Sequence, residues 1–216
     1  MKYGIFDMDG TLVDSMGVWN RASEEYLISC GVEEPDREIL DRAVPMTMPE
    51  TAGYLIRQFG LDSTPERVME EINGVMERHY RTDIPLKPGA EAFLKTLQQR
   101  GVRMAVASST SPHLLDICLR RLGVRERFDF LLSCEEVGAG KDFPDVYLEA
   151  ARRLGGTPEE TVVFEDAIFA ARTAKGAGFR VAAIRDEASL GSQEQLAAAA
   201  DWYLPSWEGA ADLFFP

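Results

Sequence analysis

The sequence predicts an α/β protein with a parallel sheet and an all-helical insertion near its amino terminus. From residue 90 onward, short apolar runs of strand length alternate with helix-length segments, which is typical of a parallel sheet covered by helices on both faces. Between residues 16 and 80, apolar residues recur at helical spacing and no strand-like run interrupts them. A length of 216 residues suits one domain, or a compact core that carries a smaller insertion.

The first predicted element is a short buried strand, Tyr3–Phe6, which ends where the polar run Asp7–Thr11 begins. The insertion then contains about four helices with turn signals between them. Those signals are Gly31, Glu34–Asp36, Pro45, Pro49, Gly60 and Thr64–Pro65. We therefore expect residues 1–15 and 83–216 to form the α/β core and residues 16–82 to form an inserted helical domain.

Strands and helices alternate through the rest of the chain. The predicted strands are 103–107, 128–132, 161–164 and 179–184, and the predicted helices are 90–100, 112–122, 144–154 and 167–175. The alanine run at 197–200 indicates a further helix. Strands joined through helices imply right-handed crossovers, so we expect the strands to lie parallel.

The charge of the chain restricts its partners. Acidic residues outnumber basic ones, 36 to 23, which gives a net charge of −13. Such a chain repels nucleic-acid phosphates and anionic lipid, so we expect neither nucleic acid nor a membrane as a partner. A small phosphorylated molecule would be repelled as well, so a site for it needs local hydrogen-bond donors or a metal ion.

The cysteines and the apolar stretches indicate a cytoplasmic protein. Cys30, Cys118 and Cys134 lie far apart, without the spacing of a zinc site or of a disulfide framework. The chain starts without the pattern of a signal segment, and no apolar stretch reaches the length of a membrane-spanning helix.

Polar residues directly follow three of the predicted strands. They are Asp7 and Asp9, Ser108 and Ser109, and Glu165 and Asp166. In an open parallel sheet, ligands bind beyond the carboxyl ends of the strands. We therefore expect these three groups to converge on one crevice, although they are scattered in the sequence.

Asp7 and Asp9 place two carboxylates just after the first strand. One carboxylate can attack phosphorus as a nucleophile, and the other can protonate the leaving group and then activate water. Gly10 allows a tight reversal of the chain, and Thr11 offers a hydroxyl and a backbone N–H to an anion. An ordinary surface turn could carry the same run, whereas a calcium loop needs a third acidic position that is missing here.

Glu165 and Asp166 are candidates for a metal site. Mg²⁺ takes oxygen ligands in an octahedron and retains waters, which leaves room for a substrate phosphate. Asp7, the backbone carbonyl of Asp9, and Asp166 would supply three ligands, with Glu165 acting directly or through water. The alternative is that Asp166 caps the helix that starts near Ala167.

Ser108 and Ser109 precede a predicted helix, where hydroxyls and free N–H groups can bind a phosphate. Ser111, directly before a proline, is better explained as an N-cap. Lys141 lies in a loop and could neutralise both the nucleophile and the transferring phosphoryl group. Its loop is no phosphate-binding P-loop, because Glu135 stands where that motif has its first glycine.

Together these residues resemble the haloacid dehalogenase superfamily, in the branch that contains β-phosphoglucomutase and small sugar phosphatases. The first motif of that family, D-x-D-G-T-L-x-D-S, stands in full from Asp7 to Ser15. Ser108, Lys141 and Glu165–Asp166 match its second, third and fourth motifs.

The resemblance implies a Rossmann-like sheet and an Mg²⁺-dependent phosphomonoester hydrolase with Asp7 as nucleophile and Asp9 as general acid and base. The phosphate ligands it implies are Thr11, Ser108 and Lys141, and the Mg²⁺ ligands are Asp7, Asp9 and Asp166. The insertion corresponds to the family's cap, hinged near 14–16 and 82–88, which closes over a small phosphorylated metabolite.

The chain departs from the family at several positions. Asp142 stands where relatives usually carry proline, and Ala167 and Ala170 replace a serine and a glycine. In the insertion, Trp19 stands where sugar-phosphate mutases carry histidine, and the loop 44–49 lacks their arginine.

The last two departures favour hydrolysis over mutase chemistry, because a bisphosphate intermediate would lack its second clamp. A sugar-phosphate mutase remains the alternative. A non-catalytic protein that binds a phosphorylated ligand is disfavoured, because both aspartates and the lysine are retained.

Overall fold

In the computed structural model, which describes residues 1–44 and 46–215, the chain divides into two compact units. We call Met1–Met16 together with Ile84–Pro216 the α/β unit, and Gly17–Asp83 the helical unit.

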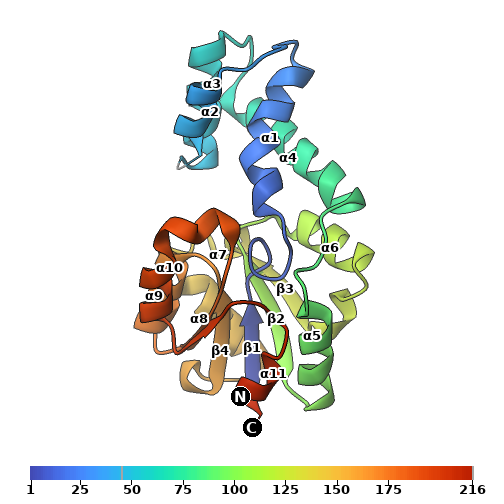
Figure 1. Cartoon of the computed structure of the whole chain (residues 1–216), viewed down its shortest axis with the longest axis vertical. Helices are drawn as coiled ribbons and strands as arrows, with labels where there is room; N and C mark the ends of the chain where they lie inside the picture. The colour runs from blue at the N-terminus through green and yellow to red at the C-terminus, as the bar shows by residue number, and fades with distance from the viewer. Residues whose placement is uncertain (45, 216) are drawn as a thin grey trace. The chain divides into compact units, whose positions relative to one another are not determined.

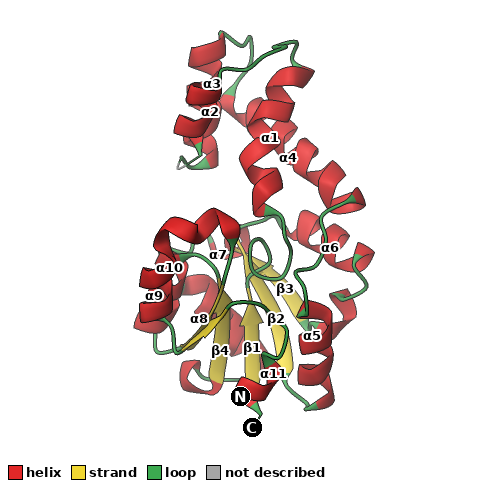
Figure 2. Ribbon diagram, in the orientation of Figure 1, coloured by secondary structure: helices red, strands yellow, loops and turns green. Residues whose placement is uncertain are grey.

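A six-stranded sheet, counted over the described residues, forms the centre of the α/β unit (Figure 1 and Figure 2). Its strands are β1 Tyr3–Phe6, β2 Arg103–Ser108, β3 Phe130–Ser133, β4 Thr161–Glu165, β5 Arg180–Ile184 and β6 Trp202–Leu204. They lie in the order β3-β2-β1-β4-β5-β6, and each neighbouring pair is parallel. The strand order therefore reverses beside β1, between β2 and β4.

Helices cover both faces of this sheet (Figure 2). One face carries α8 Asp145–Leu154, α9 Ile168–Gly176 and α10 Gln193–Ala199, and the other carries α5 Ala90–Gln99, α6 Pro112–Arg121 and α11 Ala211–Phe214. The short helix α7, Cys134–Val137, directly follows β3.

Each face of the sheet has its own apolar layer, because side chains alternate along a strand. Ile5, Ala105 and Val163 belong to the cluster on the α8 and α9 side. On the opposite side the rings of Phe6 and Phe164 stack with their centroids 4.3 Å apart. Burial of each such ring contributes about 1.5–3 kcal/mol, which fixes β1 against β4.

The segments that leave and re-enter the α/β unit are paired with each other. Val13 and Leu86 form an antiparallel bridge. The amide of Asp14 donates to the carbonyl of Pro85 at 3.0 Å, and the amide of Lys87 donates to the carbonyl of Leu12 at 2.9 Å. The outgoing and returning chains are thus joined by backbone hydrogen bonds.

The helical unit contains most of α1 Met16–Ser29 and all of α2 Arg37–Ala43, α3 Met48–Phe59 and α4 Pro65–Thr82. The Glu50 carboxylate accepts from the Thr47 amide at 2.9 Å, and this contact begins α3. Gly60, in the left-handed conformation with φ 63°, ends that helix. Pro45, a predicted turn signal, lies outside the described residues.

The structure confirms the predicted fold class, a parallel sheet with surrounding helices. The sequence did not indicate α7, β6 or α11, each of which has three or four residues. The helices α7 and α11 each span about one turn, and β6 buries only Leu204, so none of the three shows an apolar pattern. The predicted strand 128–132 starts later, at Phe130, because Arg125–Arg127 forms a 3₁₀ turn before it. Pro216, at the end of the predicted core, is also outside the described residues.

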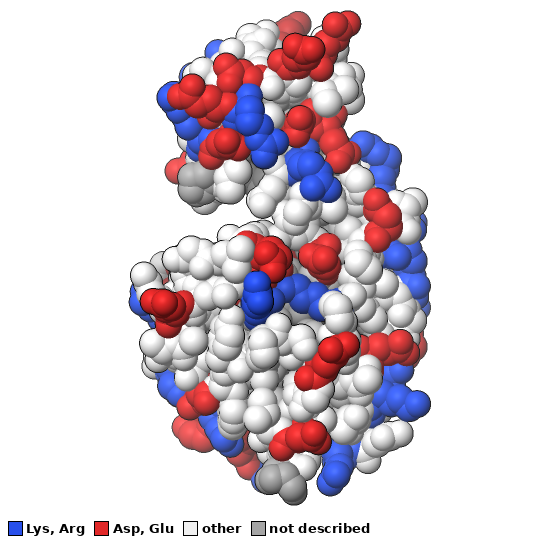
Figure 3. Space-filling model, in the orientation of Figure 1, with Lys and Arg blue, Asp and Glu red and all other residues white. Residues whose placement is uncertain are grey.

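Charged side chains of both signs are interspersed over the face of the molecule drawn in Figure 3. Exposed ion pairs of the chain include Lys2 with Glu160 and Arg42 with Glu38. No helix within the described residues has the length and apolar character needed to cross a bilayer.

Candidate active site

The point where the strand order reverses brings two acidic segments to the same edge of the sheet. Phe6 of β1 is in register with Phe164 of β4, and the Asp7 amide donates to the Phe164 carbonyl at 3.0 Å. Because the two strands are parallel, the residues that follow them leave at the same end. The sequence thereby places Asp7 beside Glu165 and Asp166.

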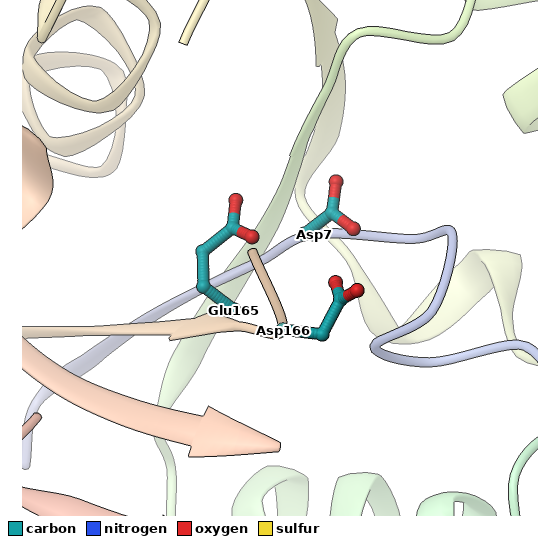
Figure 4. A group of neighbouring side chains, drawn as sticks. All are labelled: Asp7, Glu165 and Asp166. Atoms are coloured by element: carbon teal, nitrogen blue, oxygen red, sulfur yellow. The ribbon is translucent and has the colours of Figure 1, made fainter. Parts of the chain in front are cut away.

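The three carboxylates form one buried cluster (Figure 4). One oxygen from each of Asp7, Glu165 and Asp166 lies within 4.8 Å of the others. The exposed fractions of these residues are 5%, 1% and 5%, so solvent does little to screen their charges. We call these three residues the acidic cluster.

Lys141 joins the acidic cluster from a different loop. Its Nζ donates to Asp7 Oδ1 and, at 2.5 Å, to Glu165 Oε1. The hydroxyl of Tyr147, on α8, donates to the same Glu165 oxygen at 2.7 Å. Glu165 is therefore held by two donors, and the Lys141 ammonium is fixed beside the Asp7 carboxylate.

Burial controls the charges of these groups. Burial raises the pKa of Asp7 well above 3.8, although the Lys141 charge opposes this rise. Burial also raises the pKa of Asp166 to about 7, and the Glu165 charge adds to that effect. For Lys141, burial alone would lower the pKa, but Asp7 and Glu165 raise it above 10.5. Lys141 stays charged, but its single positive charge does not balance the negative charge that the three carboxylates carry when they are ionised.

The turn after β1 packs directly on Asp166. Thr11 Oγ1 donates to Asp166 Oδ1 at 2.9 Å. Gly10 has φ +78°, and a Cβ at this position would lie 2.4 Å from Asp166 Oδ2. The N-cap position of α9 is Ala167, so the Asp166 side chain serves the turn rather than the helix end.

The Asp9 carboxylate accepts hydrogen bonds from two hydroxyl groups. Its Oδ1 accepts from Ser15 Oγ at 2.6 Å, and its Oδ2 accepts from Thr110 Oγ1 at 2.7 Å. The Asp9 side chain thus links the first turn to the loop after β2. The metal-ligand role of its backbone carbonyl stays a prediction.

The two serines after β2 are held differently from each other. Ser108 is 1% exposed, and its Oγ accepts from the Thr110 amide at 3.1 Å. Ser109 Oγ donates to Cys134 Sγ at 3.8 Å. Ser111 is the N-cap of α6, as expected from the proline that follows it. The phosphate-binding role of Ser108 and Ser109 stays a prediction.

Sequence reasoning did not single out Thr110 or Tyr147. Thr110 belongs to the hydroxyl-rich run after β2, which was the available signal for it. Tyr147 occupies an apolar position of α8 and is fully buried, so the pattern indicates only a core residue.

The donor set of the acidic cluster fits a divalent metal. Carboxylate oxygens are the ligands that hard dications such as Mg²⁺ prefer. When ionised, the three carboxylates carry more negative charge than Lys141 offsets, and a dication would balance the difference. The arrangement can hold a cation next to a nucleophilic carboxylate.

Comparison with known proteins gives a consistent result. A family model described as haloacid dehalogenase-like hydrolase matches residues 4–184. Phosphorylated carbohydrates phosphatase from Thermotoga maritima is 31% identical over 180 residues, covering 82% of this chain and 82% of that protein. Hexitol phosphatase B from Escherichia coli is 29% identical over 177 residues, covering 82% of this chain and 80% of that protein.

One similar solved structure is that of a CbbY mutant from Rhodobacter sphaeroides in complex with xylulose-(1,5)bisphosphate. It has a TM-score of 0.81 at 26% identity and covers 96% of this chain and 95% of that chain.

Proposed function

Because this chain belongs to the haloacid dehalogenase-like hydrolase family, we propose that it is an Mg²⁺-dependent phosphatase of small phosphorylated metabolites. One observation carries the proposal. Lys141 contacts both Asp7 and Glu165 in a buried site that also contains Asp166. A nucleophilic carboxylate, a fixed cation beside it and a set of oxygen ligands are what phosphoryl transfer requires.

In the first half of the proposed reaction, an Asp7 carboxylate oxygen attacks the substrate phosphorus. The bond between phosphorus and the substrate oxygen breaks as the new bond to Asp7 forms, and the departing oxygen takes a proton from the Asp9 carboxyl. The products of this step are the free alcohol and an aspartyl phosphate on Asp7. Lys141 stabilises the negative charge on the phosphoryl oxygens.

In the second half, water replaces the substrate oxygen. Asp9 now accepts a proton from the water as its oxygen attacks phosphorus, and the bond to Asp7 breaks. Inorganic phosphate leaves, Asp7 is free again, and Asp9 is protonated for the next cycle.

Thr11, Ser108 and Ser109 are the further phosphate ligands that we propose, alongside Lys141. Ser108 and Ser109 would offer hydroxyl groups at the carboxyl end of β2. Thr11 would offer its backbone N–H, because its hydroxyl already donates to Asp166.

We assign Mg²⁺ to Asp7, the Asp9 carbonyl and Asp166. Bound there, the cation would offset the negative charge of the phosphate and of Asp7. Glu165 already accepts from Lys141 and Tyr147 through one oxygen, so we propose that it acts through water or as the lysine's counter-ion.

Phosphorylated sugars are the substrate class that we favour, because relatives named for phosphorylated carbohydrates and hexitols cover most of the chain. We further propose that residues 16–82 act as a cap over the substrate. In that segment the indole Nε1 of Trp19 donates to the Tyr80 hydroxyl at 3.1 Å. Its N–H is thus already engaged within the helical unit, which supports hydrolysis over mutase chemistry.

The test is hydrolysis of 4-nitrophenyl phosphate with and without Mg²⁺. Activity should need the metal, and Asp7→Asn should lower kcat by at least about a thousandfold because the nucleophile is lost. Asp212→Asn, an exposed carboxylate on α11, is the matched control and should keep full activity. Asp9→Asn should slow alkyl phosphates more than aryl phosphates, since alkoxides need a proton to leave. Unchanged turnover in Asp7→Asn would reject the mechanism.

A further inference from the structure

The carbonyl oxygen of Thr11 accepts a buried hydrogen bond from the far end of the chain. The indole Nε1 of Trp207 donates to it at 2.9 Å, and Trp207 is 2% exposed. A buried carbonyl is unfavourable without a partner, so this bond favours one orientation of the peptide group. Trp207 lies beyond residue 184, where the family match ends.

The hydroxyl of the same threonine contacts the acidic cluster. Thr11 Oγ1 donates to Asp166, and both side chains are buried. One residue therefore connects Trp207, through its backbone, with Asp166, through its side chain. The Leu12 amide donates to the Met8 carbonyl at 2.9 Å, which closes the turn around this connection.

The ring of Trp207 packs at the ends of the two strands that carry the site. Its centroid lies 5.9 Å from that of Phe6 and 5.4 Å from that of Phe164. Asp7 directly follows Phe6, and Glu165 directly follows Phe164. A displacement of this ring would reach both strand ends through packed aromatic contacts.

The backbone around Trp207 is closely packed as well. Gly89 has φ +85°, and a Cβ there would lie 2.6 Å from the Glu208 amide nitrogen. The absence of a side chain at Gly89 lets the segment after β6 approach this closely. Trp207 is thus fixed from its backbone side and from its ring side.

We propose that Trp207 is a positioning residue for the reaction of Asp7. Its indole N–H holds the Thr11 carbonyl, and Thr11 in turn holds Asp166 next to Asp7. The kinetic part of this proposal rests on the proposed function, whereas the ordering of the turn at residues 7–13 does not. A ring that only filled the core would not need its N–H, so removal of that group separates the two roles.

The experiment compares Trp207→Phe with Trp202→Phe. Trp202 lies on β6, and its ring contacts Phe214 at 4.9 Å and the Arg180 guanidinium at 4.3 Å. It is therefore a matched control for an indole-to-phenyl change in the same segment. Hydrogen exchange of residues 8–13, thermal unfolding, and kcat and KM for 4-nitrophenyl phosphate are measured for each variant.

We expect faster exchange at residues 8–13 in Trp207→Phe and a kcat about tenfold lower, with a smaller change in KM. Trp202→Phe should leave both quantities at their wild-type values. Equal exchange rates at residues 8–13 and equal kcat in the two variants would overturn the proposal, even if both variants have a lower unfolding temperature than the wild type.

Two further comparisons separate the positioning role from core filling and from a failure of the proposed function. Trp207→Phe also removes ring volume from a buried position, so 3-benzothienylalanine at position 207, which keeps the shape of the double ring and removes only the N–H, is measured beside it. Wild-type exchange and kcat in that protein would reject the positioning role. If the wild type hydrolyses no phosphate ester, the proposed function fails, and the exchange measurement alone decides the role of Trp207.

Discussion

Gly10 illustrates how one backbone position supports the acidic cluster. Its φ of +78° lies in the left-handed region, which side chains strongly disfavour. The space that a Cβ would fill is already occupied by the Asp166 carboxylate. Glycine is thus required both by the backbone conformation and by the contact.

We predict that Gly10→Ala lowers the free energy of unfolding by about 1–3 kcal/mol and weakens Mg²⁺ binding about 10–100-fold. The second effect follows because the methyl group would displace Asp166 from Asp7. Gly123→Ala is the matched control, since Gly123 has φ +70° with nothing within 4 Å of a Cβ. Calorimetric titration with Mg²⁺ should separate the variants, and equal metal affinity in the two would contradict the prediction.

Among single residues, those that directly follow a strand were easier to predict from the sequence than those that reach the site from another loop or helix. Asp7 and Asp166 could be placed together because parallel strands end at one edge of a sheet. Lys141 was a weak signal, since a loop lysine is usually solvated and only the fold brings its ammonium to Asp7. Tyr147 could not be identified, because the partner of its hydroxyl depends on how α8 crosses the sheet.

Among the elements, the long amphipathic helices and the buried strand β1 were predictable, whereas β6, α7 and α11 were not. The helix α4, Pro65–Thr82, shows its apolar stripe over many turns and has a threonine cap at Thr64. The strand β6, Trp202–Leu204, has only three residues and is defined by pairing with β5. Such an element exists because of its neighbour, and its own sequence carries little indication of it.

His79 connects two elements of the helical unit. Its Nε2 lies 2.9 Å from Glu25 on α1, and its Nδ1 lies 3.0 Å from Asp83 at the end of α4. Burial alone would lower the pKa of His79, but the hydrogen bonds with these two carboxylates raise it above 6.5. The protonated histidine therefore stabilises the folded state below pH 6.5, and this contribution is lost as the pH rises through the raised pKa.

We predict that the wild type loses about 1–3 °C of its unfolding temperature between about pH 6 and pH 8 through this residue. His79→Gln, which stays neutral, should lack that part of the pH dependence. Circular dichroism of both proteins across the same pH series gives the comparison. Parallel curves for the two proteins would contradict a stabilising role of the protonated histidine.

For the whole molecule, the net charge of −13 sets how an anionic substrate approaches. The charge repels phosphate esters at long range, while Lys141 attracts them only at the site. Added salt screens the long-range part first, because the Debye length falls from about 30 Å at 10 mM to about 10 Å at 100 mM.

We predict that KM for a phosphate ester falls as sodium chloride is raised over that range, with kcat nearly constant. A steady-state salt series at fixed Mg²⁺ concentration measures this effect. Lysine acetate over the same range of ionic strength controls for specific effects of chloride. A KM that rises with salt would show that local positive charge controls the approach instead.

The backbone bonds between residues 12–14 and 85–87 have a consequence for how such a protein can change. The segments by which the chain leaves the sheet and returns to it are hydrogen-bonded to each other. A short loop in place of residues 17–83 would leave these bonds intact, and an insert of another length could connect the same two segments. The gene can therefore exchange the inserted module without rebuilding the sheet, so selection can act on the two parts at different rates.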